Sequence, residues 1–243
     1  GTLRFLSGIM SGLIVNSNTA ENDIWVIDNV TQNINVLSKI DARLVQEVRS
    51  IEGVETSYSI VVANTSVSFA DGKVTAVNLV GSDGPEFIGG PNVNKIVAGS
   101  LSDLYQNDAV SAEYFNSKNL GVELKIGQSF EMNDKSAKVR VLTKNAQGFG
   151  GNYMFTSLNN VRFYGNLPAN QVSVVVVKIK PGADPQAVIN RINQTFYGVK
   201  AWDVEKLKTS TVSEILVTSN MGASFGSLIV FATISGFFII GLT

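Results

Sequence analysis

The chain of 243 residues contains neither cysteine nor histidine. Without cysteine it forms no disulfide and offers no thiol nucleophile, and without histidine it lacks the commonest general base. Zinc sites built from these two residue types are excluded as well. These absences exclude most common hydrolase mechanisms. They also mean that a hydrophobic core, rather than disulfides, must stabilise the fold.

An excess of charge of either sign is also missing. The chain has 19 Lys and Arg residues against 20 Asp and Glu residues, a formal net charge of −1. Nucleic-acid binding requires a cluster of cations that neutralises phosphates, and no such stripe of Lys and Arg occurs here. The composition therefore argues against a nucleic-acid partner.

Charged residues are absent from both ends of the chain. The stretches Phe5–Ala20 and Ile215–Thr243 carry none, and the second half of the latter is almost wholly apolar. A bilayer is crossed by roughly 20 mostly apolar residues, and a charge at the centre costs about 2.5–3.5 kcal/mol. We therefore expect residues 1–20 to end one transmembrane helix and residues 215–243 to start another, in a longer protein. A signal-like or tethering role for the first stretch is the alternative.

The region between these ends begins with a strand–helix–strand pattern. Asp23–Asp28 is rich in β-formers, and a polar link over residues 29–39 follows it. Within Asp41–Ile51 the apolar residues recur with helical spacing, Asp41 is placed to cap the helix, and Gly53 suits its end. A strand over Thr56–Val62 completes the unit. Beyond it, Asp71-Gly72 predicts a hairpin between the strands Ser66–Phe69 and Val74–Val80.

The same pattern returns late in the chain. A nearly continuous apolar strand over Gln171–Ile179 precedes the N-cap and proline pair Asp184-Pro185, a helical stripe, Gly198 and a strand over Lys200–Val204. Two such units pack as a split β-α-β domain, which we place at residues 21–84 and 170–214. The alternative is that a common unit occurs twice by coincidence.

The intervening residues 85–169 have a different pattern. Ala109–Asn119 is a candidate helix, Glu123–Ile126 and Ser129–Met132 flank a hairpin turn at Gly127-Gln128, and Ala137–Leu142 alternates as a strand. These features predict an inserted, mostly-β subdomain. The whole is then an α+β fold, a porter-like split β-α-β domain with a β insert, flanked by transmembrane helix segments.

Sequence motifs offer little chemistry. Gly222–Gly226 matches the G-x-S-x-G nucleophile elbow, but the chain has no histidine to serve it, and small residues there favour close helix packing. Gly148–Gly151 is interpreted as a turn, and the chain has no phosphate-binding P-loop sequence. The carboxylates are scattered, without calcium-loop spacing. Trp25 and Trp202 are expected to be core residues or membrane-proximal anchors. We predict no catalytic, cofactor-binding or metal-binding residues.

The order of these parts resembles the MacB/FtsX-like ABC transporter permeases, and among them the DevC-like exporters. The resemblance covers nearly the whole chain and rests on an ordered set of segments rather than on one motif. The segments are Asn22–Asp28, Leu44–Val54, Ala109–Phe115 with Leu120-Gly121 and Ile126-Gly127, and Tyr153–Leu158.

The resemblance implies a non-catalytic permease subunit in the bacterial plasma (inner) membrane, with its main domain in the periplasm or exterior. It implies a homodimer in contact with membrane lipid, and a cytosolic ABC ATPase on a separate chain. It also implies a periplasmic membrane-fusion adaptor and an outer-membrane channel beyond it. The domain would couple ATP hydrolysis to export or efflux through rigid-body movement.

A two-helix membrane receptor also places a domain between two membrane helices, so an extracellular ligand-sensing domain is the alternative. Such a receptor tends to begin with a long helix that leaves the membrane. Here a strand at Ile24 follows the first apolar stretch almost at once, which favours the permease.

Overall fold

The computed structural model of the chain describes residues 11–84, 87–114, 122–148 and 151–218. Its strands are β1 (Ile24–Asp28), β2 (Ile40–Asp41), β3 (Val54–Ser68), β4 (Val74–Ser82), β5 (Ile96–Ala98), β6 (Ala109–Glu113), β7 (Ser129–Met132), β8 (Lys135–Thr143), β9 (Gln147–Gly148), β10 (Gly151–Ser157), β11 (Gln171–Val172), β12 (Val174–Ile179) and β13 (Val199–Asp203). Its α-helices are α2 (Gly12–Asn16), α3 (Leu44–Glu47), α5 (Leu158–Gly165), α6 (Pro185–Thr195) and α7 (Val204–Thr218), with 3₁₀ turns η1 (Val48–Ser50), η2 (Val93–Lys95) and η3 (Leu101–Tyr105).

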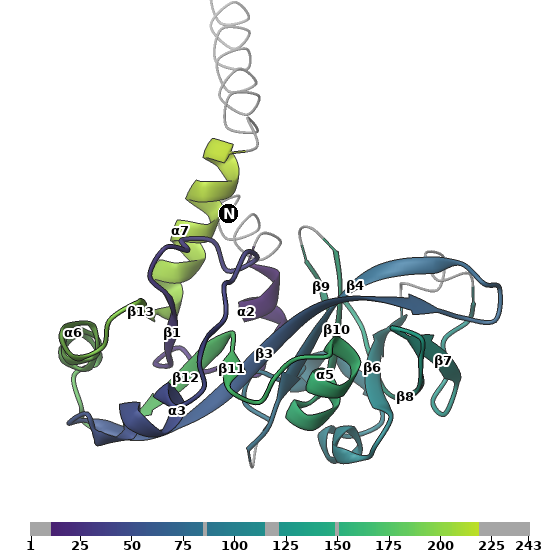
Figure 1. Cartoon of the computed structure of the whole chain (residues 1–243), viewed down its shortest axis with the longest axis horizontal. Coiled ribbons are helices and arrows are strands. Elements are labelled where there is room, and N and C mark those ends of the chain that lie inside the picture. Colours follow the sequence, from purple (N-terminus) through teal and green to yellow (C-terminus); the bar gives the residue numbers. More distant parts are fainter. Residues whose placement is uncertain (1–10, 85–86, 115–121, 149–150, 219–243) are drawn as a thin grey trace, which may run out of the picture.

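Two strand–helix–strand units build one half of the molecule (Figure 1). The strand order is β13-β1-β12-β3, and every neighbouring pair is antiparallel. α3 with η1 connects β1 to β3, and α6 connects β12 to β13. The two units, far apart in the sequence, thus share one sheet, and the predicted α+β class with a split β-α-β arrangement is confirmed.

Helix α6 forms where its sequence predicts it. Asp184 accepts a hydrogen bond from the backbone N–H of Gln186 at 3.2 Å, and Pro185 occupies the first turn. Val188 and Ile192 are fully buried on its inner face. Gly198 then turns the chain with φ +75°, a conformation that glycine adopts without strain.

The first predicted helix is shorter than expected. Helical residues begin at Leu44 rather than Asp41, and the last turn tightens into η1. Asp41 belongs to β2, and its carboxylate pairs with Arg43 at 2.7 Å, so it does not cap the helix. Leu44 and Val45 nevertheless face the core, as their spacing predicts.

A long hairpin carries the sheet into the other half. β3 merges two predicted strands into one, and its antiparallel pairing with β4 runs from Ile60 opposite Ser82 to Ser68 opposite Val74. β10 then adds parallel to β4, and β9 together with β5 to β8 completes an 11-stranded sheet. The mostly-β insert is therefore present, while the boundaries given above for each domain stay a prediction.

Two predictions within the insert are wrong. The expected helix over Ala109–Asn119 begins with a strand, β6, which pairs parallel to β8 and is buried at all five positions. A strand buried on both faces shows no alternation, so its sequence resembles a short buried helix. Residues 115–121 lie outside the described part.

The predicted turn at Gly127-Gln128 does not join two paired strands. β7 pairs with β8 instead, through a turn at Asn133 and Asp134, whose φ angles are +49° and +60°. Asn and Asp tolerate this left-handed conformation better than other non-glycine residues. At Gly127-Gln128, the Gln128 side chain accepts from the backbone N–H of Lys125 at 3.0 Å, which closes a local turn.

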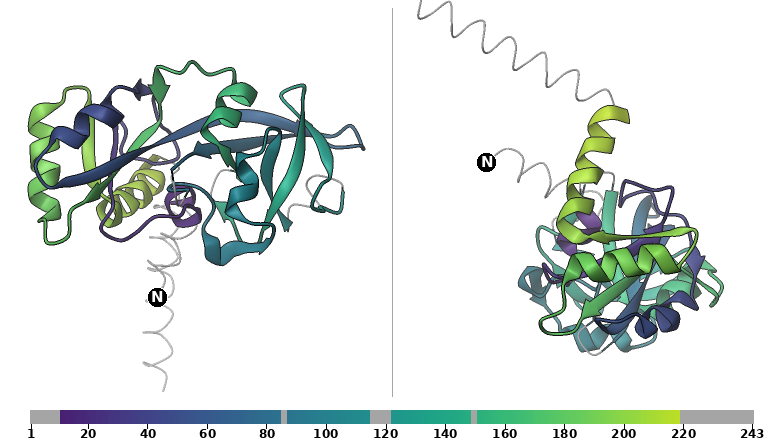
Figure 2. Two further views of the ribbon diagram at one scale, coloured as in Figure 1. Left: turned by 90° about the horizontal axis from the view of Figure 1, so that it is seen from below. Right: turned by 90° about the vertical axis from the view of Figure 1, so that its left-hand side faces the viewer.

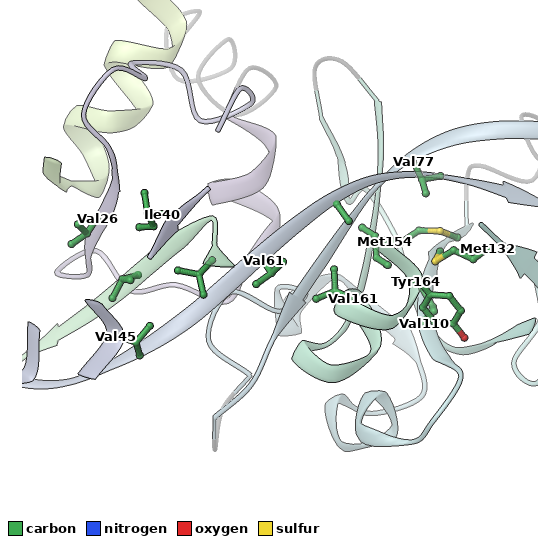
Figure 3. Packing of buried hydrophobic residues seen from close by; sticks show 14 of the residues in the cluster. Val26, Ile40, Val45, Val61, Val77, Val110, Met132, Met154, Val161 and Tyr164 are labelled. Atoms are coloured by element: carbon green, nitrogen blue, oxygen red, sulfur yellow. The ribbon is translucent and has the colours of Figure 1, made fainter. Parts of the chain in front are cut away.

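Apolar side chains fill both faces of the sheet. On one face, α3, α5 and α6 cover a core that runs from Val26 and Val45 through Val61 to Val161 and Tyr164 (Figure 3). On the opposite face, α2 and α7 cover a second core that includes Trp25, Tyr153 and Phe155. The left panel of Figure 2 shows α3 and α5 on one side of β3 and α2 and α7 on the other.

The two tryptophans lie opposite each other in β1 and β13. Trp25 is fully buried, so the prediction of a core position is confirmed for it. Trp202 is only partly buried, and the Lys200 ammonium lies 3.9 Å from the centre of its ring. This geometry is a cation–π contact.

A side chain occupies the open edge of β13. The Asn193 amide accepts from the backbone N–H of Ala201 at 2.7 Å and donates to its carbonyl at 3.4 Å. Asn193 thus satisfies the groups to which an added strand would bind, and exposed edges without such protection invite aggregation.

The predicted membrane segments fall largely outside the described residues, which exclude 1–10 and 219–243. Among the residues that the structure describes, no helix combines the length and the apolarity that crossing a membrane requires. The flanking transmembrane helices therefore stay a prediction.

Candidate functional site: the junction of α2, α7 and the sheet

The helices nearest the two ends of the described chain lie on the same face of the sheet (Figures 1 and 2). Leu13 and Ile14 of α2 are buried there, as is Leu207 of α7. The Ser11 hydroxyl donates to the carbonyl of Lys208 at 3.4 Å, so the two segments also contact each other. A movement of either end of the described chain would therefore act on the sheet at the same place, the junction of α2 and α7.

The segment after α2 is attached to the chain that enters the insert. Asn18 N–H donates to the carbonyl of Gly90 at 2.7 Å, and Asn92 N–H donates to the carbonyl of Asn16 at 2.8 Å. Lys95 adds a hydrogen bond to the Asn16 side chain. Burial lowers the pKa of Lys95, although the negative charge of Glu113 opposes that shift. α2 is thus connected to the insert by both backbone and side-chain bonds.

Residues 29–39, which we call the bridging loop, are held in shape by Asp28. Its carboxylate accepts from the backbone of Val30 and Thr31, from the Thr31 hydroxyl at 2.7 Å, and from Ser38 N–H at 3.1 Å. Burial by itself raises the pKa of Asp28, but these hydrogen bonds outweigh it and leave the pKa lowered. The ionised form of Asp28 therefore organises the loop.

The bridging loop contacts α7 in the core. Ile34, 1% exposed, donates its N–H to the Thr211 hydroxyl at 3.1 Å, and the Ser210 hydroxyl donates to the carbonyl of Gln32 at 2.9 Å. Thr211 itself donates to the carbonyl of Leu207, so its hydroxyl is both a hydrogen-bond donor and an acceptor. The loop and α7 are consequently joined by one bond inside the core and by a second bond at the surface.

The same loop also contacts the sheet. The Tyr153 hydroxyl of β10 donates to the Asn35 side chain at 3.0 Å, and Lys39 donates to the Ser173 hydroxyl at 3.0 Å and to the carbonyl of Val62. Burial raises the pKa of Tyr153 to about 12 and lowers that of Lys39. The bridging loop is thus a physical connection between α7, the split β-α-β half and the insert.

An open hollow of about 870 Å³ lies where β1, β3 and β12 approach the turn before α6. In its wall Asp23, only 3% exposed, pairs with Lys178 at 2.6 Å and also accepts from Ala20 N–H at 2.8 Å. Removing Lys178 would leave the Asp23 carboxylate buried without its partner, which is destabilising. This arrangement stabilises the strand ends and provides no reactive group.

The structure also bears on the predicted absence of catalytic and metal-binding sites. In residues 11–84, 87–114, 122–148 and 151–218, no group of three or more acidic side chains is placed to hold a metal ion. Gly222–Gly226 lies outside the described residues, as do two residues of the Gly148–Gly151 turn. The prediction of no catalytic, cofactor or metal site therefore stays a prediction.

Reasoning from sequence missed the bridging loop, which was interpreted only as a polar link. One local signal was available, because an Asp followed three residues later by Thr is typical of a side-chain-capped turn. No local signal marks Thr211, Tyr153 or Lys39, since their partners are distant in sequence.

Comparison with known proteins agrees with this architecture. The sequence model of the MacB-like periplasmic core domain matches residues 5–195. The periplasmic region of MacB from Actinobacillus actinomycetemcomitans superposes with a TM-score of 0.56 at 9% identity, over 78% of this chain and 92% of that one. The extracellular domain of the noncanonic ABC-type transporter YknZ from Gram-positive bacteria gives a TM-score of 0.51 at 11% identity, over 74% and 99%. Among curated proteins, none matches.

These findings define the class of the protein as an extracytoplasmic domain of a membrane transporter. The chain belongs to the MacB-like periplasmic core domain family, and the expected resemblance to MacB-like ABC transporter permeases is confirmed. Its assignment to the DevC-like subgroup stays a prediction.

Proposed function

We propose that this domain couples ATP hydrolysis by a cytosolic ABC ATPase to export or efflux, acting as the moving extracytoplasmic part of a homodimeric permease in the bacterial plasma membrane. In this proposal the domain carries no catalytic residues. A periplasmic adaptor docks on it, and an outer-membrane channel continues the path.

One observation carries the proposal: α2 and α7 both pack against the same face of the sheet through buried side chains. Ser11 bonds to Lys208, and α7 bonds to the bridging loop through Thr211. Elements packed in this way transmit displacement as rigid bodies, because packed cores have discrete arrangements and do not deform continuously.

Such a two-state displacement does not require a substrate pathway through the domain. The open hollow beside Asp23 and Lys178 is a place where a partner could dock at the end of the sheet. A rigid movement of the sheet would change the position of that surface relative to the membrane.

The experiment is mild cross-linking of the native protein in its membrane, followed by purification and identification of the partners. Recovery of a P-loop ATPase together with a membrane-fusion adaptor is the expected result. Recovery of a kinase or chemotaxis scaffold without an ATPase would refute the proposal and favour the ligand-sensing receptor.

A further inference from the structure

A second, more enclosed hollow of about 280 Å³ lies beneath the bridging loop. Asn35 to Leu37 of the loop form one wall and Leu13 of α2 another, while Asn64, Asn78 and Tyr153 form the floor. Its volume is just below the lower limit of about 300 Å³ that is usual for small-molecule sites. The hollow therefore has room for a small ligand and not for a peptide.

Lys39 is the sole charged residue among the described residues that line this hollow. Its ammonium group has three N–H donors, of which one bonds to the Ser173 hydroxyl and another to the carbonyl of Val62. In the described part of the chain, no carboxylate forms an ion pair with it, although Lys178 and Lys208 both have one. Lys39 is partly buried, and a cation that has lost part of its water without gaining an anionic partner is unfavourable, so an anion in the hollow would stabilise it.

The floor provides polar groups at a suitable position. Asn64 of β3 lies opposite Asn78 of β4, and Asn78 lies opposite Tyr153 of β10, so the three side chains form a row across the sheet. The row lies on the face that α2 and the loop cover. Amides in this position can donate to the oxygens of a ligand, while Leu13 and Val62 offer apolar contact.

We propose that the hollow binds a small organic anion, with its carboxylate beside Lys39 and a short apolar part against Leu13 and Val62. The occupant would contact the bridging loop, α2 and the sheet at once. This binding site does not depend on the proposed transport function, because it requires only the geometry of the hollow.

The test uses butyrate as an anionic probe and butyramide as its neutral analogue of the same shape. Ligand-observed NMR titration of the detergent-solubilised full chain gives the dissociation constants. We expect saturable binding of butyrate, and binding of butyramide weaker by at least about tenfold, as for the loss of a hydrogen bond to a charged group. Equal binding of the two probes, or no saturable binding of butyrate, would overturn the proposal.

Variants locate the site. Lys39→Met should weaken butyrate binding at least about tenfold, whereas the matched control Lys180→Met, at an exposed lysine of the other hollow, should leave it unchanged. Asn78→Leu, which keeps the charge and fills the floor, should also weaken binding. Circular dichroism confirms that each variant is folded. Butyrate binding that survives both Lys39→Met and Asn78→Leu in folded protein would show that the hollow is not the site.

Discussion

The backbone N–H of Ile34 donates to the Thr211 hydroxyl at 3.1 Å, and this bond joins the bridging loop to α7 inside the core. The two residues are 177 positions apart in sequence. Thr211 is fully buried and Ile34 is nearly so, so neither group can bond to water instead. The bond therefore contributes to the stability of the junction and to its mechanical continuity.

Replacing Thr211 by valine tests this bond. Thr211→Val keeps the shape of the side chain but leaves the Ile34 N–H buried without an acceptor, which should cost about 1–3 kcal/mol of unfolding free energy. Urea denaturation measures the loss. The exposed neighbour Thr209, whose hydroxyl bonds within the helix, provides the control Thr209→Val, which should change stability by less than about 0.5 kcal/mol. Similar losses in the two variants would contradict the role given to Thr211.

Asp28 should make the domain sensitive to acid. Because its pKa is lowered in the folded state from the usual 3.8, its contribution to stability is present above pH 3.8 and is lost as pH falls through the folded-state pKa. Asp28→Asn should destabilise the domain at pH 7 and flatten the decline below pH 4. Thermal unfolding followed between about pH 2 and 7 tests this. Asp71→Asn, in the exposed β3–β4 turn, is the control. An unchanged acid profile for Asp28→Asn would refute the prediction.

Tyr153 should make the domain sensitive to alkali. The pKa of Tyr153 is raised from 10.0 to about 12. Its contribution to the stability of the fold is therefore present below pH 10 and is lost as the pH rises through 12. A shift of this size corresponds to about 2–3 kcal/mol. Tyr153→Phe should remove that part of the alkaline loss, as seen in unfolding measurements at pH 9 and at pH 12. Tyr197→Phe, at a residue 98% exposed, should leave the alkaline loss unchanged.

Asn193 should suppress self-association through β13. Asn193→Ala frees the N–H and the carbonyl of Ala201 at the sheet edge, and unpaired edge groups form templates for another strand. Sedimentation velocity should show a larger oligomeric fraction for this variant. Asn190→Ala, on the same helix with only an exposed bond to Gln186, should sediment like the unmodified chain. If both variants remain equally monodisperse, Asn193 does not protect the edge.

The split β-α-β units could be predicted from sequence because their signals are local. In the second unit, three neighbouring features predict the same helix and its end. They are Pro185 after an Asp cap, the apolar stripe around Val188 and Ile192, and a glycine past the helix. β6 could not be predicted, since a short strand buried on all sides has no periodicity that separates it from a buried helix.

The junction could not be predicted because it is built from long-range contacts. Lys39 meets Ser173 across 134 positions, and Tyr153 meets Asn35 across 118. Each of these side chains has an ordinary local context, and only the folded sheet brings them together. What the local sequence did provide was Asp28, whose spacing to Thr31 fits a capped turn.

The most direct test measures a distance between the two copies of the domain in the native protein. The chain has no cysteine, so one spin label can be placed in it at Glu131→Cys, an exposed position of β7. The labelled protein is reconstituted in membranes with its partners, and pulsed electron–electron double resonance gives the distance between the two labels of the proposed homodimer with and without vanadate-trapped ATP. As a control, the pair Thr209→Cys on α7 and Glu131→Cys, diluted with unlabelled protein, reports a distance within one copy. We expect the distance between the two copies of position 131 to change with nucleotide state, because the domain moves as a rigid body, while the distance between positions 209 and 131 within one copy stays the same. Identical distance distributions between the two copies in both states, or a changed distance within one copy, would contradict the rigid-body movement.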